Sequence, residues 1–92
     1  MPTVTLNALN VFLMVSENLS ISETARVLNL SQPAVSRMVA HVEKYYGTQL
    51  FTRQDRGLQL TEEGKLLKEK ASQALTELES AENEIYSRRH LN

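Results

Sequence analysis

The chain has 92 residues, which fits one small domain with an appendage, and 41% of them are hydrophobic, enough for a small compact core. It has no cysteine, which excludes disulfides, zinc fingers and thiol catalysis. No apolar run approaches the roughly 18 residues of a membrane span, and no signal peptide is visible at the N-terminus. The default expectation is therefore a cytoplasmic protein without a membrane partner.

The charges are unevenly distributed along the chain, although the net charge is only −1. Residues 1–60 carry five basic and four acidic side chains, which gives +1, and residues 61–92 carry five basic and seven acidic ones, which gives −2. The N-terminal part is thus mildly basic. Charge alone does not establish a nucleic-acid partner.

Helix start and stop signals divide the first part of the chain. Thr5 is placed to cap a helix over about Leu6–Glu17. The segment "SISE", Ser20–Glu23, has the form of a capping box, in which the hydroxyl serves a first-turn amide and the carboxylate reaches back. A short second helix follows to about Leu28, and Asn29, which tolerates the left-handed conformation, ends it.

The third helix has two chemically different faces. Ser31 is expected to cap it, Pro33 lies in its first turn, and Gly47 ends it after about Tyr46. One edge carries short polar residues and a basic one, and the other face is apolar. The polar edge comprises Gln32, Pro33, Ser36 and Arg37, and the apolar face comprises Val35, Met38, Val39 and Val42.

The remainder predicts a hairpin and one long helix. "QLFTR" and "LQLTE" read as two short strands around the turn "QDRG", residues 54–57. Thr61 caps a fourth helix that runs without a stop to about Arg88. The predicted fold is mainly α: three helices plus a two-stranded wing in residues 1–60, followed by a long linker and dimerisation helix in residues 61–92.

The second and third helices have the spacing of a helix-turn-helix unit. Ala25 is small where the two helices approach, Asn29 lies at the turn, and Val35 lies on the inner face. Leu28, Leu30 and Met38 complete the expected buried set. On spacing alone, an ordinary helix pair in a small bundle remains an alternative.

The functional interpretation places the third helix in a DNA major groove. Gln32 has the donor and acceptor to bind adenine in bidentate fashion, and Arg37 can reach guanine or a phosphate. The hairpin then forms a wing that places Arg53 or Arg56 along the DNA backbone or in the minor groove.

Six ordered pieces of the chain resemble the winged helix-turn-helix domain of LysR-type transcriptional regulators, from about Leu6 to Leu67. They are Ala25, Ser31-Gln32-Pro33, Ser36-Arg37, Val42-Glu43, Gly47-x-x-Leu50-Phe51-x-Arg53 and Leu60-Thr61-x-x-Gly64. The resemblance implies that Gln32, Pro33, Ser36 and Arg37 face the major groove. It also implies that Arg53 is the wing arginine and that Ser31 meets a phosphate.

The chain departs from the usual sequence of this family at some positions. Ala40 stands where many relatives have a basic residue, which removes one phosphate contact and, with the low net charge, implies modest nonspecific affinity. Val42 replaces the usual leucine. The family usually continues into a ligand-sensing domain, and this chain stops where that domain would begin. We therefore expect the effector-sensing domain to be absent from this chain.

The fourth helix carries a heptad seam of apolar residues spaced 4, 3, 4, 3 and 4: Leu67, Ala71, Ala74, Leu78, Ala81 and Ile85. One alternative is a helix docked on its own domain. The preferred interpretation is a homodimer through this helix on an inverted-repeat operator, and the resemblance implies antiparallel pairing, with a tetramer possible for a full-length protein. A competing hypothesis is a protein-interaction module whose fourth helix pairs with a different protein.

Other candidate sites are weak. His41 and His90 each lack a second ligand at metal spacing, so no metal site is expected. One of Tyr45 and Tyr46 is expected to pack in the core, and the other to offer its hydroxyl to solvent or a phosphate. The serines have no His–acid partners and no glycine-rich phosphate loop exists, so neither catalysis nor a cofactor is expected.

Overall fold

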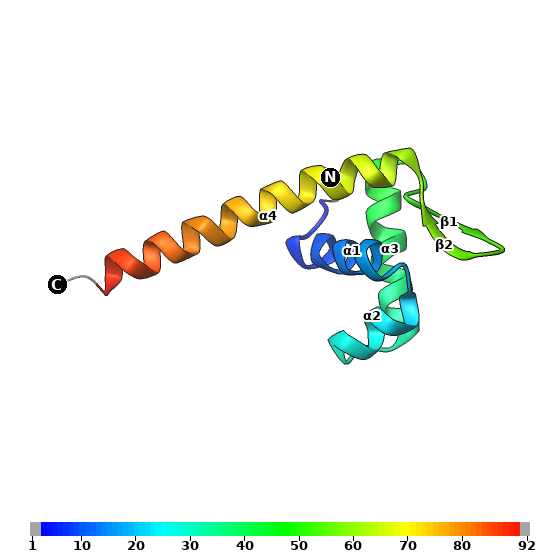
Figure 1. Cartoon of the computed structure of the whole chain (residues 1–92), viewed down its shortest axis with the longest axis horizontal. Coiled ribbons are helices and arrows are strands. Elements are labelled where there is room, and N and C mark those ends of the chain that lie inside the picture. The colour runs from blue at the N-terminus through cyan, green and yellow to red at the C-terminus, as the bar shows by residue number, and fades with distance from the viewer. Residues whose placement is uncertain (1–2, 91–92) are drawn as a thin grey trace.

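The computed structural model describes residues 3–90, so the first two residues of the predicted domain and the last two of the predicted linker helix lie outside it. Figure 1 shows a helical body from which one hairpin and one long helix project. No helix within the described range is both long and apolar enough to cross a membrane. The elements are α1 Leu6–Asn18, α2 Ile21–Leu28, α3 Gln32–Tyr46, β1 Phe51–Gln54, β2 Gly57–Leu60 and α4 Glu62–Arg89.

The four helices begin where short hydroxyl side chains occur in the sequence. Each hydroxyl oxygen accepts a hydrogen bond from the backbone amide three residues later, at 2.9–3.2 Å. These bonds satisfy amides that have no partner inside the helix. The predicted caps are therefore confirmed at all four positions: Thr5, Ser20, Ser31 and Thr61.

The predicted capping box is wrong in one respect, because the Glu23 carboxylate does not reach back to the start of the helix. Ser20 Oγ accepts from the Glu23 amide, but the Glu23 carboxylate binds Arg26 one turn later, with Arg26 Nε 3.1 Å from Oε2. A charged guanidinium is a stronger donor than a neutral backbone amide, so it captures the carboxylate. This hydrogen bond from Arg26 lowers the pKa of Glu23.

The first three helices end in left-handed backbone. Asn29 (φ 56°) and Gly47 (φ 70°) end α2 and α3 as predicted. Leu19 (φ 52°) ends α1, and its amide donates to the carbonyl of Val15 at 2.7 Å. Leucine rarely adopts this conformation, and here it closes the helix in the predicted break "ENLS".

The core forms where α1 lies against α2, α3 and α4. Phe12 in α1 is fully buried, and its ring contacts Phe51 of β1, with ring centroids 5.5 Å apart. Val35 and Val42 from α3 are also fully buried. The buried hydrophobic side chains are Ala8, Val11, Phe12, Leu13, Val15, Ala25, Val35, Val39, Val42, Leu50, Phe51 and Ala71.

The predicted burial of the helix-turn-helix set is correct in part. Leu28 and Met38 are half-buried and pack against the core, but Leu30 is 41% exposed. The amide of Leu30 donates to the carbonyl of Ala25 at 2.9 Å, which closes the left-handed turn at Asn29. This turn places the Leu30 side chain at the surface, where it lines a shallow hollow with Met38.

The long helix α4 is docked on the body over only part of its length. Ala71 is buried, Leu67 and Leu75 pack against the core, and Lys68 Nζ donates to the carbonyl of Ser16 at 3.4 Å. A helix of 28 residues is about 42 Å long. Its C-terminal half therefore extends beyond the body, as Figure 1 shows, and gives the chain extents of 57 × 27 × 26 Å.

Candidate nucleic-acid interface

The structure separates the two faces of α3 as the sequence predicts. Val35 and Val42 are fully buried and Val39 nearly so, which fixes the rotation of the helix about its axis. The four side chains of the predicted polar edge of α3 are all exposed: Gln32, Pro33, Ser36 and Arg37. The start of α3 thus presents an edge of hydrogen-bonding groups that the protein itself does not use for packing.

Ser31, which is predicted to bind a phosphate at the start of α3, is also exposed. Ser31 precedes the helix in extended conformation (φ −76°, ψ 153°), and its hydroxyl oxygen accepts from the amide of Ala34 at 3.2 Å. A hydroxyl that accepts in this way still has its own hydrogen to donate. Ser31 can therefore cap the helix and bind an anion simultaneously.

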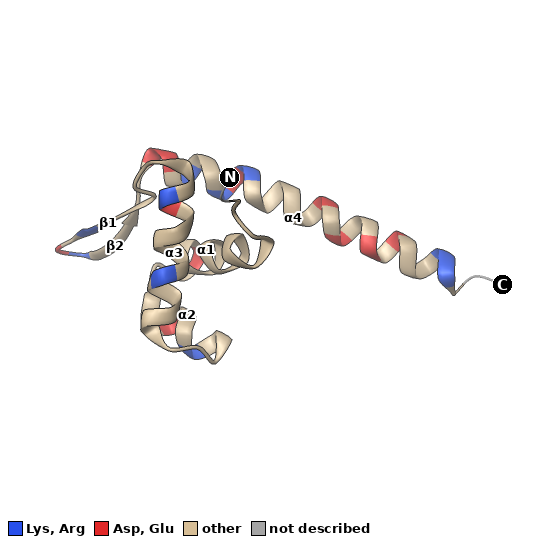
Figure 2. Ribbon diagram, turned by 180° about the vertical axis from the view of Figure 1, so that it is seen from behind, with Lys and Arg blue, Asp and Glu red and all other residues tan. Residues whose placement is uncertain are grey.

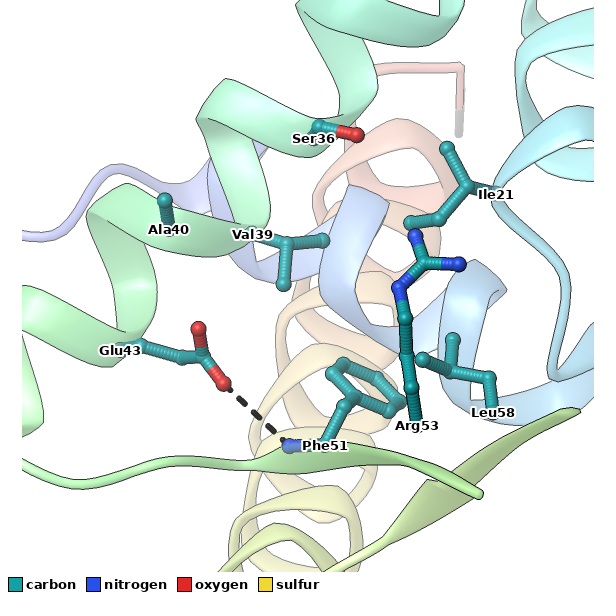
Figure 3. Close-up of a pocket in the computed structure, with 8 residues that line it drawn as sticks. All are labelled: Ile21, Ser36, Val39, Ala40, Glu43, Phe51, Arg53 and Leu58. Carbon is teal, nitrogen blue, oxygen red and sulfur yellow. Dashed lines mark hydrogen bonds between the residues drawn. The ribbon is translucent and has the colours of Figure 1, made fainter. Parts of the chain in front are cut away.

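A hollow between α3 and the hairpin brings the two predicted binding elements together. It is lined by Ile21, Ser36, Val39, Ala40, Glu43, Phe51, Arg53 and Leu58, with a volume of about 180 Å³. Figure 3 shows Arg53 rising from β1 along Leu58, with its guanidinium group toward Ile21. Ser36 of the polar edge and Arg53 of the wing therefore border the same surface.

The predicted hairpin is present, but its strand bounds differ from the prediction: Gln54 and Gly57 belong to the paired strands, only Asp55 and Arg56 lie between them, and Gln49, Thr61 and Glu62 lie outside them. β1 and β2 are antiparallel, with Phe51 opposite Leu60 and Arg53 opposite Leu58. Gly57 (φ 98°) supplies the turn conformation that other residues rarely adopt, and exposed Arg56 precedes it. The wing thus carries one arginine beside α3 and a second at its tip.

Both ends of the hairpin are held at its base. Thr61 Oγ donates to the carbonyl of Gln49 at 2.8 Å, and the Thr61 amide donates to the carbonyl of Leu50 at 3.0 Å. On the other side, Glu43 Oε2 accepts from the amides of Leu50 at 2.8 Å and Phe51 at 3.3 Å. Sequence reasoning included Glu43 in the matching motif without assigning it this contact.

The balance of basic and acidic side chains differs between elements: α3 and the hairpin each carry two basic and one acidic side chain, whereas α4 carries five basic and seven acidic ones. Figure 2 shows basic positions on α3 and at the hairpin tip, whereas acidic positions predominate in the projecting part of α4. The basic positions accompany the polar edge of α3. The charge distribution therefore favours an anionic partner at α3 and the wing rather than along α4.

Both histidines are exposed. Within residues 3–90, no group of three or more His, Cys, Asp or Glu side chains is placed to hold a metal ion. His41 is exposed, and its Nε2 lies 3.4 Å from the carbonyl oxygen of Thr3. His90 is also exposed and lies against Tyr86, with ring centroids 4.1 Å apart.

The prediction of a core tyrosine at the end of α3 is wrong. Tyr45 and Tyr46 are each 44% exposed. Their rings contact each other edge to face, with centroids 4.9 Å apart and an interplanar angle of 83°. The core beneath this turn is already filled by Val42 and Leu50, which leaves the tyrosines to pack on one another.

The predicted seam of α4 divides into two parts. Leu67 and Ala71 face the core of their own domain. The other members are exposed, with Leu78 at 43% and Ile85 at 58%. The free part of the seam consists of Ala74, Leu78, Ala81 and Ile85.

Comparison with known proteins identifies the family. Residues 6–65 match the model of bacterial regulatory helix-turn-helix proteins of the lysR family. The chain belongs to this family. The matched segment begins at α1 and ends just inside α4, so it contains every element of this LysR-type winged helix-turn-helix domain.

Sequence relatives carry regulator names. The chain is 38% identical over 75 residues to the HTH-type transcriptional regulator TdcA of Escherichia coli, covering 82% of this chain and 24% of TdcA. It is 40% identical over 81 residues to a carbapenem-hydrolyzing beta-lactamase transcriptional activator of Enterobacter cloacae, covering 88% of this chain and 28% of the activator. The chain thus spans about a quarter of the length of these relatives.

Solved structures of this family share the arrangement, including structures with DNA. The BenM DBD/catB site 1 DNA complex matches with a TM-score of 0.90 at 26% identity, covering 96% of this chain and 99% of that one. DarR of Vibrio fischeri in complex with DNA matches with a TM-score of 0.88 at 27% identity, covering 99% of this chain and 31% of DarR. The agreement includes the long helix as well as the body.

Proposed function

We propose that this chain binds double-stranded DNA sequence-specifically as the DNA-binding part of a homodimeric transcriptional regulator. The observation that carries the proposal is the exposed polar edge of α3 bordering the same surface as Arg53 of the wing. A major groove admits one α-helix, and a neighbouring wing can then follow the backbone. The regulator names of the relatives and their DNA complexes support this proposal, which assigns the chain no catalytic activity.

Each exposed group has a role that follows from its chemistry. Gln32 offers a donor and an acceptor to adenine, and Arg37 offers two parallel donors to guanine. Pro33 and Ala34 keep the end of the helix slim where it approaches the bases, Pro33 offers apolar contact to a thymine methyl group, and Ser36 offers its hydroxyl to a base edge. Arg53 and Arg56 bind the backbone or the minor groove, and Ser31 donates its hydroxyl hydrogen to a phosphate.

The dimer of this proposal uses the exposed part of α4. Residues 1–60 form the DNA-binding domain and residues 61–92 the linker and dimerisation helix. Because Leu67 and Ala71 already face their own core, pairing with a second copy uses the free part of the seam around Leu78 and Ile85. Burial of these side chains by a second antiparallel helix removes apolar surface from water. Two α3 helices are then available for the two half-sites of an inverted repeat.

The modest charge of the domain sets the expected affinity for unspecific DNA. The net charge of residues 1–60 is only +1, and exposed Ala40 adds no cation beside Ser36. Each phosphate neutralised adds to the dependence of binding on salt. Few phosphate contacts therefore predict weak nonspecific binding, so that specificity depends on the edge of α3. Such a regulator works in the compartment that holds the DNA, the bacterial cytoplasm.

Selection from a pool of random duplexes at two salt concentrations tests the proposal. We expect an inverted repeat with a fixed half-site spacing, recovered more strongly at the lower salt concentration. A parallel selection uses the double variant Arg37→Ala/Arg53→Ala, which lacks both proposed DNA-binding arginines. Any duplex that this variant also recovers is retained by other surfaces of the protein. Recovery of no sequence above background would contradict DNA binding and favour a protein partner for α3.

A further inference from the structure

Glu43 is an acidic side chain at the edge of a surface proposed to bind an anion, and the proposed function gives it no role. It lies on α3, half-buried, three residues before the helix ends. Figure 3 shows its carboxylate pointing across the hollow to the start of β1, away from the Ser36 edge. Its contact therefore joins α3 to the start of the wing.

The Glu43 carboxylate holds the first residues of the wing. Its Oε2 atom accepts from the amides of Leu50 at 2.8 Å and Phe51 at 3.3 Å. Leu50 is 1% exposed and Phe51 is 8% exposed, so both residues whose amides bind the carboxylate are buried. Hydrogen bonds to an ionised acceptor are about twice as strong as neutral ones.

The backbone of Glu43 strengthens the same junction. Its carbonyl accepts from Gly47 at 2.8 Å and from Thr48 at 3.2 Å, which closes the end of α3. One residue thus fixes the end of the helix, the turn that follows, and Leu50 and Phe51 at the start of β1. The remaining part of the hairpin is short, and a two-stranded hairpin of this length is marginally stable by itself.

The orientation of β1 determines where Arg53 lies. Residues two apart in a strand point to the same face, so Arg53 shares the face of Phe51, whose ring packs on Phe12. Both Phe51 and Arg53 line the hollow with Ser36. Loss of the contact at Glu43 would let the strand rotate or move at its base, and the displacement would be larger at Arg53 and at the tip.

We propose that Glu43 is a positioning residue that fixes the wing relative to α3, so that Arg53 and the polar edge of α3 reach the same DNA. This inference rests on the proposed function. It makes an acidic side chain favourable for binding an anion, because its hydrogen bonds to the wing outweigh its repulsion of phosphates. A direct electrostatic role predicts the opposite effect, since removal of a negative charge near the interface would strengthen binding.

Three variants separate charge from reach. Glu43→Gln removes the charge but keeps an acceptor oxygen at the same distance, Glu43→Asp keeps the charge but shortens the side chain, and Glu43→Ala removes both. Their binding to the duplex recovered by selection is compared by fluorescence anisotropy. We expect Glu43→Ala and Glu43→Asp to bind about five- to tenfold more weakly, the loss expected for one hydrogen bond. Glu43→Gln should lose less, about two- to threefold, because its neutral oxygen accepts the same two bonds more weakly than the carboxylate does.

A second background tests whether Glu43 acts through the wing. In Arg53→Ala/Arg56→Ala, the wing has lost both arginines, so the additional substitution Glu43→Ala should weaken binding by less than about twofold. An equal loss in both backgrounds would overturn the proposal, as would stronger binding by both Glu43→Ala and Glu43→Gln. If the parent itself recovers no sequence, the proposed DNA binding fails first, which distinguishes the two failures.

The free chain provides a readout that does not need DNA. The amides of Leu50 and Phe51 should exchange with solvent more slowly in the parent and in Glu43→Gln than in Glu43→Ala, while the amides of α1 exchange equally in all three. Equal exchange of Leu50 and Phe51 in all variants would overturn the positioning role. Faster exchange throughout Glu43→Ala would indicate a destabilised fold. The positioning role is then tested by Glu43→Asp, in which Leu50 and Phe51 should exchange faster than in Glu43→Gln, and equal exchange in these two variants would overturn it.

Discussion

Gly64 lies where the first turn of α4 crosses the base of the wing, and its replacement by alanine tests this packing. A Cβ atom at Gly64 would overlap the carbonyl oxygen of Leu50 and lie 2.8 Å from Leu60 Cδ2. The same carbonyl oxygen accepts the amide of Thr61 at 3.0 Å. The new methyl group therefore displaces backbone that already has a hydrogen-bonding role, and a flexible side chain cannot relieve the overlap.

Helix propensity and packing give opposite signs for Gly64→Ala. Propensity alone predicts a gain in stability of up to about 1 kcal/mol, because alanine is the better helix former. Overpacking costs about 1–3 kcal/mol, and weakening of the bond from Thr61 costs about 1 kcal/mol more. We therefore expect a net loss of about 1–3 kcal/mol, which lowers Tm by about 4–8 °C for each kcal/mol.

Thermal unfolding followed by circular dichroism, at one fixed protein concentration, measures this loss. Gly47→Ala is the control, because Gly47 is in left-handed conformation (φ 70°) with no atom within 4 Å of an added Cβ. Gly47→Ala should lose about 1–2 kcal/mol of stability, because alanine is strained in the left-handed conformation. Gly64→Ala that is as stable as the parent, or more stable, would refute the packing at the base of the wing.

Two further predictions concern the seam and the surface ion pair. Leu78→Glu should shift sedimentation toward monomer, because it places a charge in the free part of the seam, whereas Thr76→Glu, also exposed, should leave the dimer intact; equal behaviour of the two variants would exclude pairing through Leu78. The hydrogen bond from Arg26 lowers the pKa of Glu23 in the folded state. The Arg26–Glu23 ion pair therefore stabilises the fold at neutral pH, and this stabilisation is lost as the pH falls through the lowered pKa. In urea unfolding, Glu23→Gln should therefore be less stable than the parent at neutral pH and equally stable in acid, and a constant difference would argue against the ion pair as its source.

Local chemistry explains which parts of the fold could be predicted from the sequence. The caps at Ser31 and Thr61 and the end at Gly47 depend on residues within one turn, so short motifs were sufficient to place them. The polar edge of α3 followed from helical periodicity, which the buried positions of Val35 and Val42 confirm. The expected recognition surface could thus be named residue by residue before its surroundings were known.

Contacts between distant segments could not be predicted in this way. The exposure of Leu30 depends on the exact closure of the turn at Asn29, and the exposure of Tyr45 depends on how Val42 and Leu50 fill the core. The role of Glu43 depends on the loop that returns β1 to α3. No sequence period reports such a contact, which is why the motif contained Glu43 without explaining it.

The seam of α4 shows a further limit of periodicity. A 4–3 spacing predicts an apolar stripe but not what covers it. Ala71 is covered by its own domain, whereas Ile85 on the same stripe is 58% exposed. Both alternatives considered for this helix are therefore needed: docking on its own domain for the first part, and the proposed pairing with a second copy for the rest.

The central claim is that the edge of α3 reads bases while the wing holds the backbone, and base-by-base competition binding tests it most directly. The parent, Arg37→Ala and Arg53→Ala are each measured against the selected duplex and against single-base substitutions of it. We expect Arg37→Ala to lose about 1–3 kcal/mol of discrimination at one base position, and Arg53→Ala to bind all duplexes more weakly with the same preferences and a smaller salt slope. Binding by both variants that equals the parent on every duplex would contradict the assignment of α3 to the major groove.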